Sequence, residues 1–336
     1  MGSFIKPDAE DVINAAARLK TVANKTPLVR SDALDALVGA RVFLKLENMQ
    51  HTGAFKFRGA YNCLSRLDRD SCPDGVVAYS TGNHGQAIAT VGRMLDIPTI
   101  VVMPTDAPSN KIQKAKSQGA TIILYDRKTQ SREEVAAKLA SEGRYAVVPP
   151  GDHPHVIAGQ GTVAIEIFEA LGVGGVDVIL TPCGGGGLAA GTCLAVEAVG
   201  SKAEVWAAEP ADFDDTARSV QSGIREQNSG KATSICDALL APIPAELPFS
   251  INRTGLSGVL LASDEEVLTA MRFLFEEFRI VVEPGGAVAF AALLANTPQS
   301  LKGKTVAVIV SGGNVDPELF SRAINASVGD YKKHRA

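Results

Sequence analysis

The sequence predicts an α/β protein of two lobes, each a mostly parallel twisted sheet wrapped by helices. Short runs of β-branched residues recur along the chain, and each is followed by turn residues and an apolar pattern of helical period. Strands that alternate with helices in this way form parallel sheets, because each helix must cross back over the sheet. The runs are more numerous than one small sheet requires. We therefore expect two sheets with a cleft between them.

The predicted elements follow one another without a repeat or a low-complexity segment. Strands are predicted in RVFLKLE, GVVAYS, PTIVVM, ATIILY, YAVVPP, VDVILT, AEVWAAE and KTVAVIVS. Helices are predicted over residues 83 to 95, 108 to 118, 130 to 142, 157 to 171, 187 to 200, 263 to 278 and 285 to 296. The segment VVPPGDHPH, residues 147 to 155, has the composition of a crossing between lobes. His153 and His155 are expected to be loop residues, since no third ligand at metal spacing accompanies them.

Composition limits the classes of function. The chain has 336 residues, of which 46% are hydrophobic and 21% charged, as in soluble globular proteins of two domains. The net charge of -4 and the lack of a long basic run make nucleic acid an unexpected partner. No stretch has the length of a signal peptide core or a membrane span, so we expect a cytoplasmic protein that binds no membrane. The five cysteines contain no C-x-x-C pair, which favours free thiols.

The turn TPCGGGGLAAG follows a predicted strand and begins a predicted helix. Its four consecutive glycines, Gly184, Gly185, Gly186 and Gly187, leave backbone N–H groups free to converge on an anion at a positive helix end. This pattern predicts a phosphate site. The spacing also fits a dinucleotide fingerprint loosely, with Glu209 placed as a ribose-binding acid, so a nucleotide-linked oxidoreductase is the alternative.

A second turn, YSTGNHGQA, follows another predicted strand. Ser80, Thr81, Asn83 and His84 bring two hydroxyls, an amide and an imidazole to a helix start, a setting that suits a carboxylate or a phenolate. One or two of these residues have the simpler interpretation of helix N-caps. A third turn, VIVSGGN, ends the last predicted strand at Ser311 and is by itself equally typical of a tight turn.

One lysine is unusual. In HTGAFKFRGA, Lys56 lies between Phe55 and Phe57, with glycines on either side. The simplest interpretation is a surface lysine whose stem lies along the edge of the core. Aromatic neighbours would instead desolvate the amine, which makes it a better nucleophile and base near neutral pH.

Six ordered segments resemble the fold-type II family of pyridoxal-phosphate enzymes, which has the tryptophan synthase beta-like fold. Within that family they are most similar to the branch of serine and threonine dehydratases, serine racemases and 3-hydroxyaspartate ammonia-lyases. The segments span residues 43 to 314, nearly the whole chain. They are KLENMQHTGAFKFRGA, STGNHGQA, VIAGQGT, CGGGGLAAG, AAEP and SGGN.

The resemblance implies a role for each turn. Lys56 would form the Schiff base with pyridoxal phosphate, and Phe55 would pack by its ring. The residues from Gly184 to Gly187 would hold the 5'-phosphate. Asn83 would donate to the 3'-oxygen, and Ser311 would face the pyridine nitrogen. A hydroxyl cannot hold a protonated nitrogen as an acid does, so the resemblance favours prompt β-elimination over longer-lived carbanion chemistry.

The resemblance also implies a substrate. Lys56 would take the Cα proton of a β-hydroxy amino acid, and Ser80, Thr81, Asn83 and His84 would hold its α-carboxylate. Arg132 matches an arginine of the racemase branch that faces the substrate side chain, which favours 3-hydroxyaspartate over serine and threonine. The alternative for Arg132 is a solvated helix start beside two glutamates. Thr81 stands where racemases place a catalytic serine, so serine racemase is the alternative activity.

Three further expectations come from the family. Glu209, the carbonyl of Phe213 and Asp215 would bind Mg or Ca, for which hard oxygen ligands are suitable. The large domain, residues 1–72 and 150–336, would bind the cofactor, and the small domain, residues 73–149, would close over the substrate. The protein would be a homodimer. About twenty residues follow SGGN, too few for a long regulatory extension, which favours a catabolic role.

Overall fold

The computed structural model describes residues 5–80, 82–107 and 109–325 and contains two sheets. One sheet has the strand order β1-β2-β10-β7-β8-β9, and the other has the order β5-β4-β3-β6. The strands of the first are β1 (Leu28–Val29), β2 (Arg41–Leu46), β7 (Val178–Pro182), β8 (Glu204–Pro210), β9 (Leu256–Ala262) and β10 (Thr305–Val310). Those of the second are β3 (Gly75–Tyr79), β4 (Thr99–Pro104), β5 (Thr121–Tyr125) and β6 (Tyr145–Val147).

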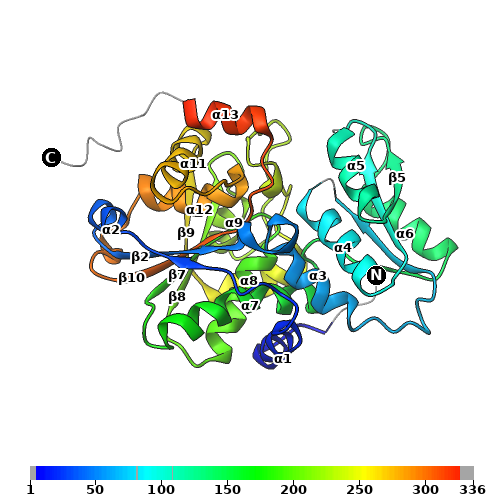
Figure 1. Cartoon of the computed structure of the whole chain (residues 1–336), viewed down its shortest axis with the longest axis horizontal. Coiled ribbons are helices and arrows are strands. Elements are labelled where there is room, and N and C mark those ends of the chain that lie inside the picture. The colour runs from blue at the N-terminus through cyan, green and yellow to red at the C-terminus, as the bar shows by residue number, and fades with distance from the viewer. Residues whose placement is uncertain (1–4, 81, 108, 326–336) are drawn as a thin grey trace.

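The pairing confirms the predicted class. Every described pair of strands is parallel except β1 with β2, which is antiparallel. In Figure 1 the four-stranded sheet, with α4, α5 and α6, forms a separate lobe beside the larger one. Its strands all lie within residues 73–149, the range predicted for the small domain. The function of that division, closure over a substrate, stays a prediction.

Helices cover both sheets. The larger lobe contains α1 (Ala9–Leu19), α2 (Asp32–Val38), α3 (Lys56–Leu64), α7 (Pro154–Leu171), α8 (Gly187–Ala198), α9 (Asp215–Ser222), α10 (Glu246–Gly255), α11 (Asp264–Phe278), α12 (Pro284–Ala295) and α13 (Pro317–Asn325). The smaller lobe contains α4 (Asn83–Met94), α5 (Ser109–Ser117) and α6 (Arg132–Glu142). Short 3-10 turns are η1 (Glu47–Met49), η2 (His51–Gly53), η3 (Asp237–Leu239) and η4 (Gln299–Leu301).

The eight predicted strands and seven predicted helices are present, with ends displaced by a few residues. The two edge strands β1 and β9 were not predicted, since β1 has two residues and β9 contains a Ser-Gly pair after its first residue. The expectation that His153 and His155 are loop residues is wrong for His155. His155 lies in α7, and His153 caps that helix by accepting a hydrogen bond from the His155 N–H. The Pro-rich composition concealed this early helix start.

The core of the larger lobe lies on both faces of its sheet. Along the fully buried strand β10, Val306, Val308 and Val310 contribute to the core under α2, α11 and α12. Ala307 and Ile309 contribute to the core under α1, α7 and α8. This alternation is that of a strand covered on both sides, because successive side chains point to opposite faces.

Glycines bring three helices of the larger lobe close together. An added Cβ at Gly159 of α7 would lie 2.7 Å from the Cα of Gly59 on α3. An added Cβ at Gly161 would lie 2.5 Å from the carbonyl oxygen of Gly191 on α8. These distances are too short for a methyl group, so α3, α7 and α8 pack backbone against backbone. Lys56 begins the first of these helices, and the glycine loop begins the last.

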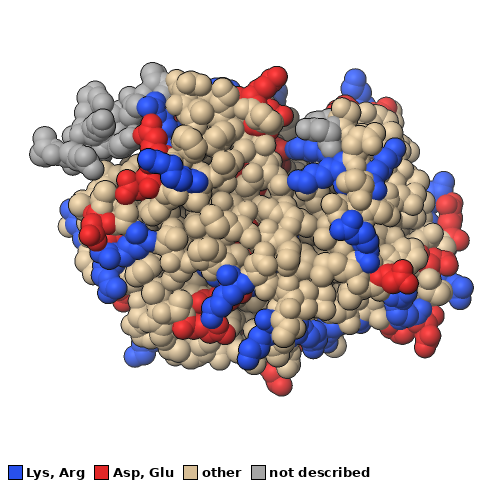
Figure 2. All heavy atoms as spheres, in the orientation of Figure 1, with Lys and Arg blue, Asp and Glu red and all other residues tan. Residues whose placement is uncertain are grey.

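The charged side chains show no dominance of one sign. Figure 2 shows Lys and Arg side chains interspersed with Asp and Glu side chains around the edge of one face. The middle of that face carries few charges. The electrostatic potential over this face is therefore of mixed sign.

Replacing Gly161 by alanine should push α7 and α8 apart. We expect the free energy of unfolding to fall by about 1–3 kcal/mol, the usual cost of overpacking. Denaturant titration followed by circular dichroism measures this change. Gly174→Ala is the matched control, because a Cβ there meets nothing within 4 Å. Equal stability of the two variants would contradict the close packing.

Candidate active site

A cavity of about 450 Å³ lies where the predicted turns meet. Turns after β3, β7 and β10 contribute to its lining, together with the start of α3 and the segments 149–152 and 237–243. Ligands of parallel sheets bind at these carboxyl ends of strands. Among the predicted site residues, the cavity is lined by Phe55, Lys56, Ser80, Asn83, His84, Arg132, Gly184, Gly185, Gly186, Gly187 and Ser311. Thr81 lies outside the described residues.

Lys56 is the first residue of α3, and its side chain is partly buried at the cavity. Its Nζ donates a hydrogen bond to the carbonyl oxygen of Pro150 at 2.6 Å and lies 5.0 Å from the centroid of the Phe55 ring. Burial lowers the pKa of the amine to about 8. The predicted desolvation is therefore present, and a larger share of this amine is neutral and nucleophilic near neutral pH than in an exposed lysine.

The glycine loop is a cup with little room for a side chain at Gly184 and Gly186. Gly186 has a φ of 90°, which favours glycine, and an added Cβ there would lie 2.6 Å from Asn252 Nδ2. That Nδ2 donates to the Gly186 carbonyl oxygen at 3.1 Å, which fixes the loop. At Gly184 an added Cβ would lie 3.0 Å from the Cα of Leu239. With α8 starting at Gly187, the loop fits a phosphate group.

Asn83 is held by two residues that the sequence interpretation did not identify as partners. Its Nδ2 donates to Glu283 Oε1 at 2.6 Å, and its Oδ1 accepts from Asn314 Nδ2 at 2.8 Å. These bonds fix the orientation of the amide and leave one Nδ2 hydrogen for a ligand. Burial raises the pKa of Glu283 to about 7. The only sequence signal for Glu283 was its place before the predicted helix at 285.

His84 and Ser80 have local partners. His84 is buried, and its Nε2 lies 2.9 Å from the Val148 carbonyl oxygen, so this nitrogen carries the hydrogen. Burial lowers the pKa of the imidazole to about 3. A neutral ring bonded in this way has no second N–H to give a carboxylate, which argues against His84 as a direct carboxylate ligand. Ser80 Oγ accepts from the Gly82 N–H at 3.1 Å.

Ser311 follows β10 and is buried beside residues 54 to 56, which lead into α3. Its carbonyl oxygen accepts from the Phe55 N–H at 3.1 Å, and Ala54 bridges to Gly312. The turn after β10 and the start of α3 therefore form one unit. This connection places the hydroxyl-bearing residue and the lysine at the same cavity, as the resemblance implies.

Arg132 is the first residue of α6 and lines the cavity. Its Cζ lies 5.4 Å from the centroid of the Tyr79 ring, and its Nε donates to Glu133 Oε1 at 2.8 Å. The side chain is 44% exposed. Both sequence interpretations therefore hold in part, since Arg132 pairs with a glutamate at a helix start and also faces the cavity. Its other N–H groups are of the kind that bind a second carboxylate.

The residues predicted to bind a metal lie together outside this cavity. Glu209 is 1% exposed, and its two oxygens accept from the Thr216 and Ala217 N–H groups at the start of α9. Asp215 is also 1% exposed, and its Oδ2 has no hydrogen-bond partner among the described residues. Phe213 lies buried in the turn between the two acids.

Burial and the nearby Asp215 raise the pKa of Glu209 to about 8, and burial raises that of Asp215 to about 6. Burial disfavours the ionised form of both carboxyls, and the charge of Asp215 adds to this effect at Glu209. The nucleotide alternative requires Glu209 to face the glycine loop's ligand. Its carboxylate is instead enclosed by α9, which argues against that alternative.

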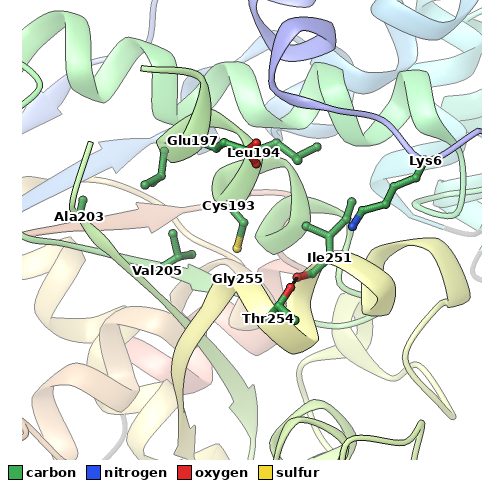
Figure 3. A pocket seen from close by; sticks show the side chains of 10 residues that line it. Lys6, Cys193, Leu194, Glu197, Ala203, Val205, Ile251, Thr254 and Gly255 are labelled. Atoms are coloured by element: carbon green, nitrogen blue, oxygen red, sulfur yellow. Dashed lines mark hydrogen bonds between the residues drawn. The ribbon is translucent and has the colours of Figure 1, made fainter. Parts of the chain in front are cut away.

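A smaller cavity, of about 310 Å³, is lined by residues of α8, β8 and α10 (Figure 3). Cys193 and Thr254 face it among aliphatic side chains, and Lys6 extends toward it from the segment before α1. Burial raises the pKa of the Cys193 thiol to about 12, so the thiol stays protonated. None of the predicted site residues lines this cavity, so the larger one is the better candidate site.

The model of a known family matches most of the chain. The family is described as "Pyridoxal-phosphate dependent enzyme", and the match covers residues 19–312. The chain belongs to this family. The two mostly parallel sheets, and the lysine beside the glycine loop, agree with the fold-type II members of this family.

Several named enzymes are similar to this chain in sequence or in structure. The chain is 43% identical to an L-threo-3-hydroxyaspartate ammonia-lyase of a Pseudomonas species, over 93% of this chain and 96% of the relative. It is 41% identical to a protein of the same name from Saccharomyces cerevisiae, over 96% of this chain and 98% of the relative. The crystal structure of serine racemase from Dictyostelium discoideum has a TM-score of 0.86 and 36% identity, covering 92% of this chain and 99% of that one.

Proposed function

We propose that the protein is a carbon-oxygen lyase that eliminates water from a β-hydroxy amino acid, and that the released enamine takes up water to give a 2-keto acid and ammonia. The favoured substrate is 3-hydroxyaspartate, followed by serine and threonine. The observation that carries this proposal is the Lys56 amine, desolvated at a cavity that it shares with the glycine cup and Arg132. The relatives named L-threo-3-hydroxyaspartate ammonia-lyase support the same reaction class.

Pyridoxal phosphate, when bound, supplies an electron sink that acidifies the Cα–H bond of an amino acid. Lys56 would hold it covalently until the substrate amine takes the place of the Lys56 amine, and the freed Lys56 amine would then take the Cα proton. The N–H groups of Gly184 to Gly187 would hold the phosphate, with Phe55 beside the ring. The remaining Nδ2 hydrogen of Asn83 would donate to the ring oxygen, and Ser311 would face the ring nitrogen.

The cavity residues also suggest how the substrate is oriented. Ser80 and the start of α4 offer donors for the α-carboxylate at a positive helix end. Arg132 would pair with the second carboxylate of 3-hydroxyaspartate. Glu133 already accepts from Arg132, so a substrate carboxylate binds beside that ion pair or displaces it. This contact distinguishes a dicarboxylic substrate from serine or threonine.

Replacing Lys56 by alanine should lower kcat for ammonia release by at least about 10³-fold, because the group that moves the proton is lost. Release of ammonia and keto acid from L-threo-3-hydroxyaspartate and L-serine measures this effect. Lys25→Ala, which removes an exposed lysine paired with Glu169, is the control and should retain activity. Unchanged turnover by Lys56→Ala would refute the assignment.

Serine racemase is the second candidate, since the serine racemase of Dictyostelium discoideum is 36% identical to this chain. Chiral chromatography of the L-serine reaction separates the two. Pyruvate formed faster than D-serine supports the lyase, and the reverse order supports the racemase.

Replacing Arg132 by alanine should raise KM for 3-hydroxyaspartate by about tenfold or more, the loss expected for a charged hydrogen bond. KM for serine should change little, because serine has no second carboxylate. Glu134→Ala, at a neighbouring position of α6, is the control. An unaltered ratio of kcat/KM values for the two substrates would exclude Arg132 as the specificity contact.

We also propose that Glu209, Asp215 and the carbonyl of Phe213 bind Mg or Ca. The fit rests on two buried carboxyls and on Asp215 Oδ2, which has no partner among the described residues. Oxygen donors of this kind suit a hard divalent cation. The cation would neutralise the buried charge and stabilise the start of α9.

Adding Mg or Ca to protein stripped with a chelator should raise Tm by a few degrees, since the ion binds only the folded state. Differential scanning calorimetry measures the rise. Asp215→Asn should abolish it, whereas Asp214→Asn, which changes the adjacent acid, should retain it. A rise that persists in Asp215→Asn would place the ion elsewhere.

Assembly and location are further proposals. No helix in the described ranges is long and apolar enough to cross a membrane. We propose a cytoplasmic homodimer. Two exposed apolar side chains support a subunit interface, namely Met49, which is 45% exposed, and Val281, which is 43% exposed. The Asn48 side chain donates to the Val281 carbonyl oxygen, which holds the two segments beside each other.

A further inference from the structure

A cluster of four charged residues is buried beside the start of α3. Arg58 and Glu47 have side chains that are 1% and 0% exposed. Glu166 of α7 and Lys45 of β2 complete the cluster, with Lys45 Nζ 2.5 Å from Glu166 Oε2. Two positive and two negative charges balance, which is the condition under which buried charges are tolerated.

Arg58 is the centre of this cluster. Its Nε and one terminal nitrogen donate to the two oxygens of Glu47, each at 2.8 Å. Its other terminal nitrogen donates to Glu166 Oε1 at 2.7 Å. Two parallel bonds to one carboxylate require the planar fork of a guanidinium, and a lysine amine cannot form them.

The cluster connects three separate elements through the first turn of α3. Glu47 follows β2 directly, Glu166 belongs to α7, and Arg58 stands two residues after Lys56. The residue before α3, Phe55, gives the helix no side-chain cap. The fork of Arg58 is therefore a side-chain anchor that ties the first turn of α3 to both η1 and α7.

We propose that Arg58 is a positioning residue for Lys56, acting through its buried fork to Glu47 and Glu166. The inference rests on the proposed role of Lys56. It concerns geometry and not charge, because the cluster is neutral as a whole. The pKa of the Lys56 amine is lowered by burial and not by the charges of this cluster. Loss of the fork would let the first turn of α3 shift, and small shifts of a catalytic group are costly in rate.

The cluster offers a matched pair of variants. Arg58→Met and Lys45→Met each remove one buried cation that pairs with Glu166, and both should lower Tm. Lys45 lies on β2 and bonds to Thr26 and Glu166, so its loss leaves the fork on α3 in place. Arg58→Lys keeps the charge and removes the fork, and it also serves if Arg58→Met does not fold.

The holoenzyme variants are compared by the visible absorbance of the lysine-bound cofactor and by kcat and KM. We expect Arg58→Met and Arg58→Lys to alter the absorbance band and to lower kcat by about tenfold or more with little change in KM. Lys45→Met should keep the wild-type band and a kcat within about twofold. Equal effects of Arg58→Met and Lys45→Met, or a wild-type band and kcat in Arg58→Lys, would overturn the proposal.

The two measurements separate this inference from the proposed function. If wild-type protein carries the cofactor on Lys56 but eliminates water from no hydroxy amino acid, the proposed function fails. The absorbance band of the Arg58 and Lys45 variants then still decides whether Arg58 positions Lys56. If the cofactor is bound through another lysine, both proposals fail.

Discussion

Backbone contact between α3, α7 and α8 sets the geometry on which the rest of the site depends. Gly159 and Gly161 of α7 leave no space for a side chain against Gly59 and Gly191. The helices therefore approach more closely than side chains would allow, and small changes there are transmitted because protein interiors are close-packed. The helix that carries Lys56 and the helix that follows the glycine cup are thereby placed against a common neighbour.

Polar side chains complete the site from the other lobe. Asn83 begins α4 of the smaller lobe, and it is oriented by Glu283 and Asn314 of the larger one. Lys111 of α5 also pairs with Asp237 of the larger lobe at 2.9 Å. The two lobes thus meet through hydrogen bonds and ion pairs at the cavity. The lobes also meet through apolar packing, because side chains of α3 in the larger lobe share one hydrophobic core cluster with side chains of β3 and α4 in the smaller lobe.

Much of this arrangement could be predicted from the sequence, because strand composition and the turns after strands are local features. The β-branched runs predicted β3, β7 and β10, and the turns after these strands do line one cavity. Contacts between distant positions could not be predicted from local patterns. Glu283 lies 200 residues from Asn83 along the chain. Each glycine of α7, taken alone, indicates only a poor helix former and not a contact with another helix. The resemblance identified VIAGQGT as a matching segment. The structure shows that its two glycines let α7 contact the backbones of α3 and α8.

The central claim is that the Lys56 amine is the group that holds pyridoxal phosphate. Reduction of the holoenzyme with borohydride fixes the cofactor to its lysine, and mass spectrometry of the peptides then identifies that lysine. The account predicts a single modified peptide that contains Lys56 between Phe55 and Phe57. Modification of any other lysine, or of none, would contradict it.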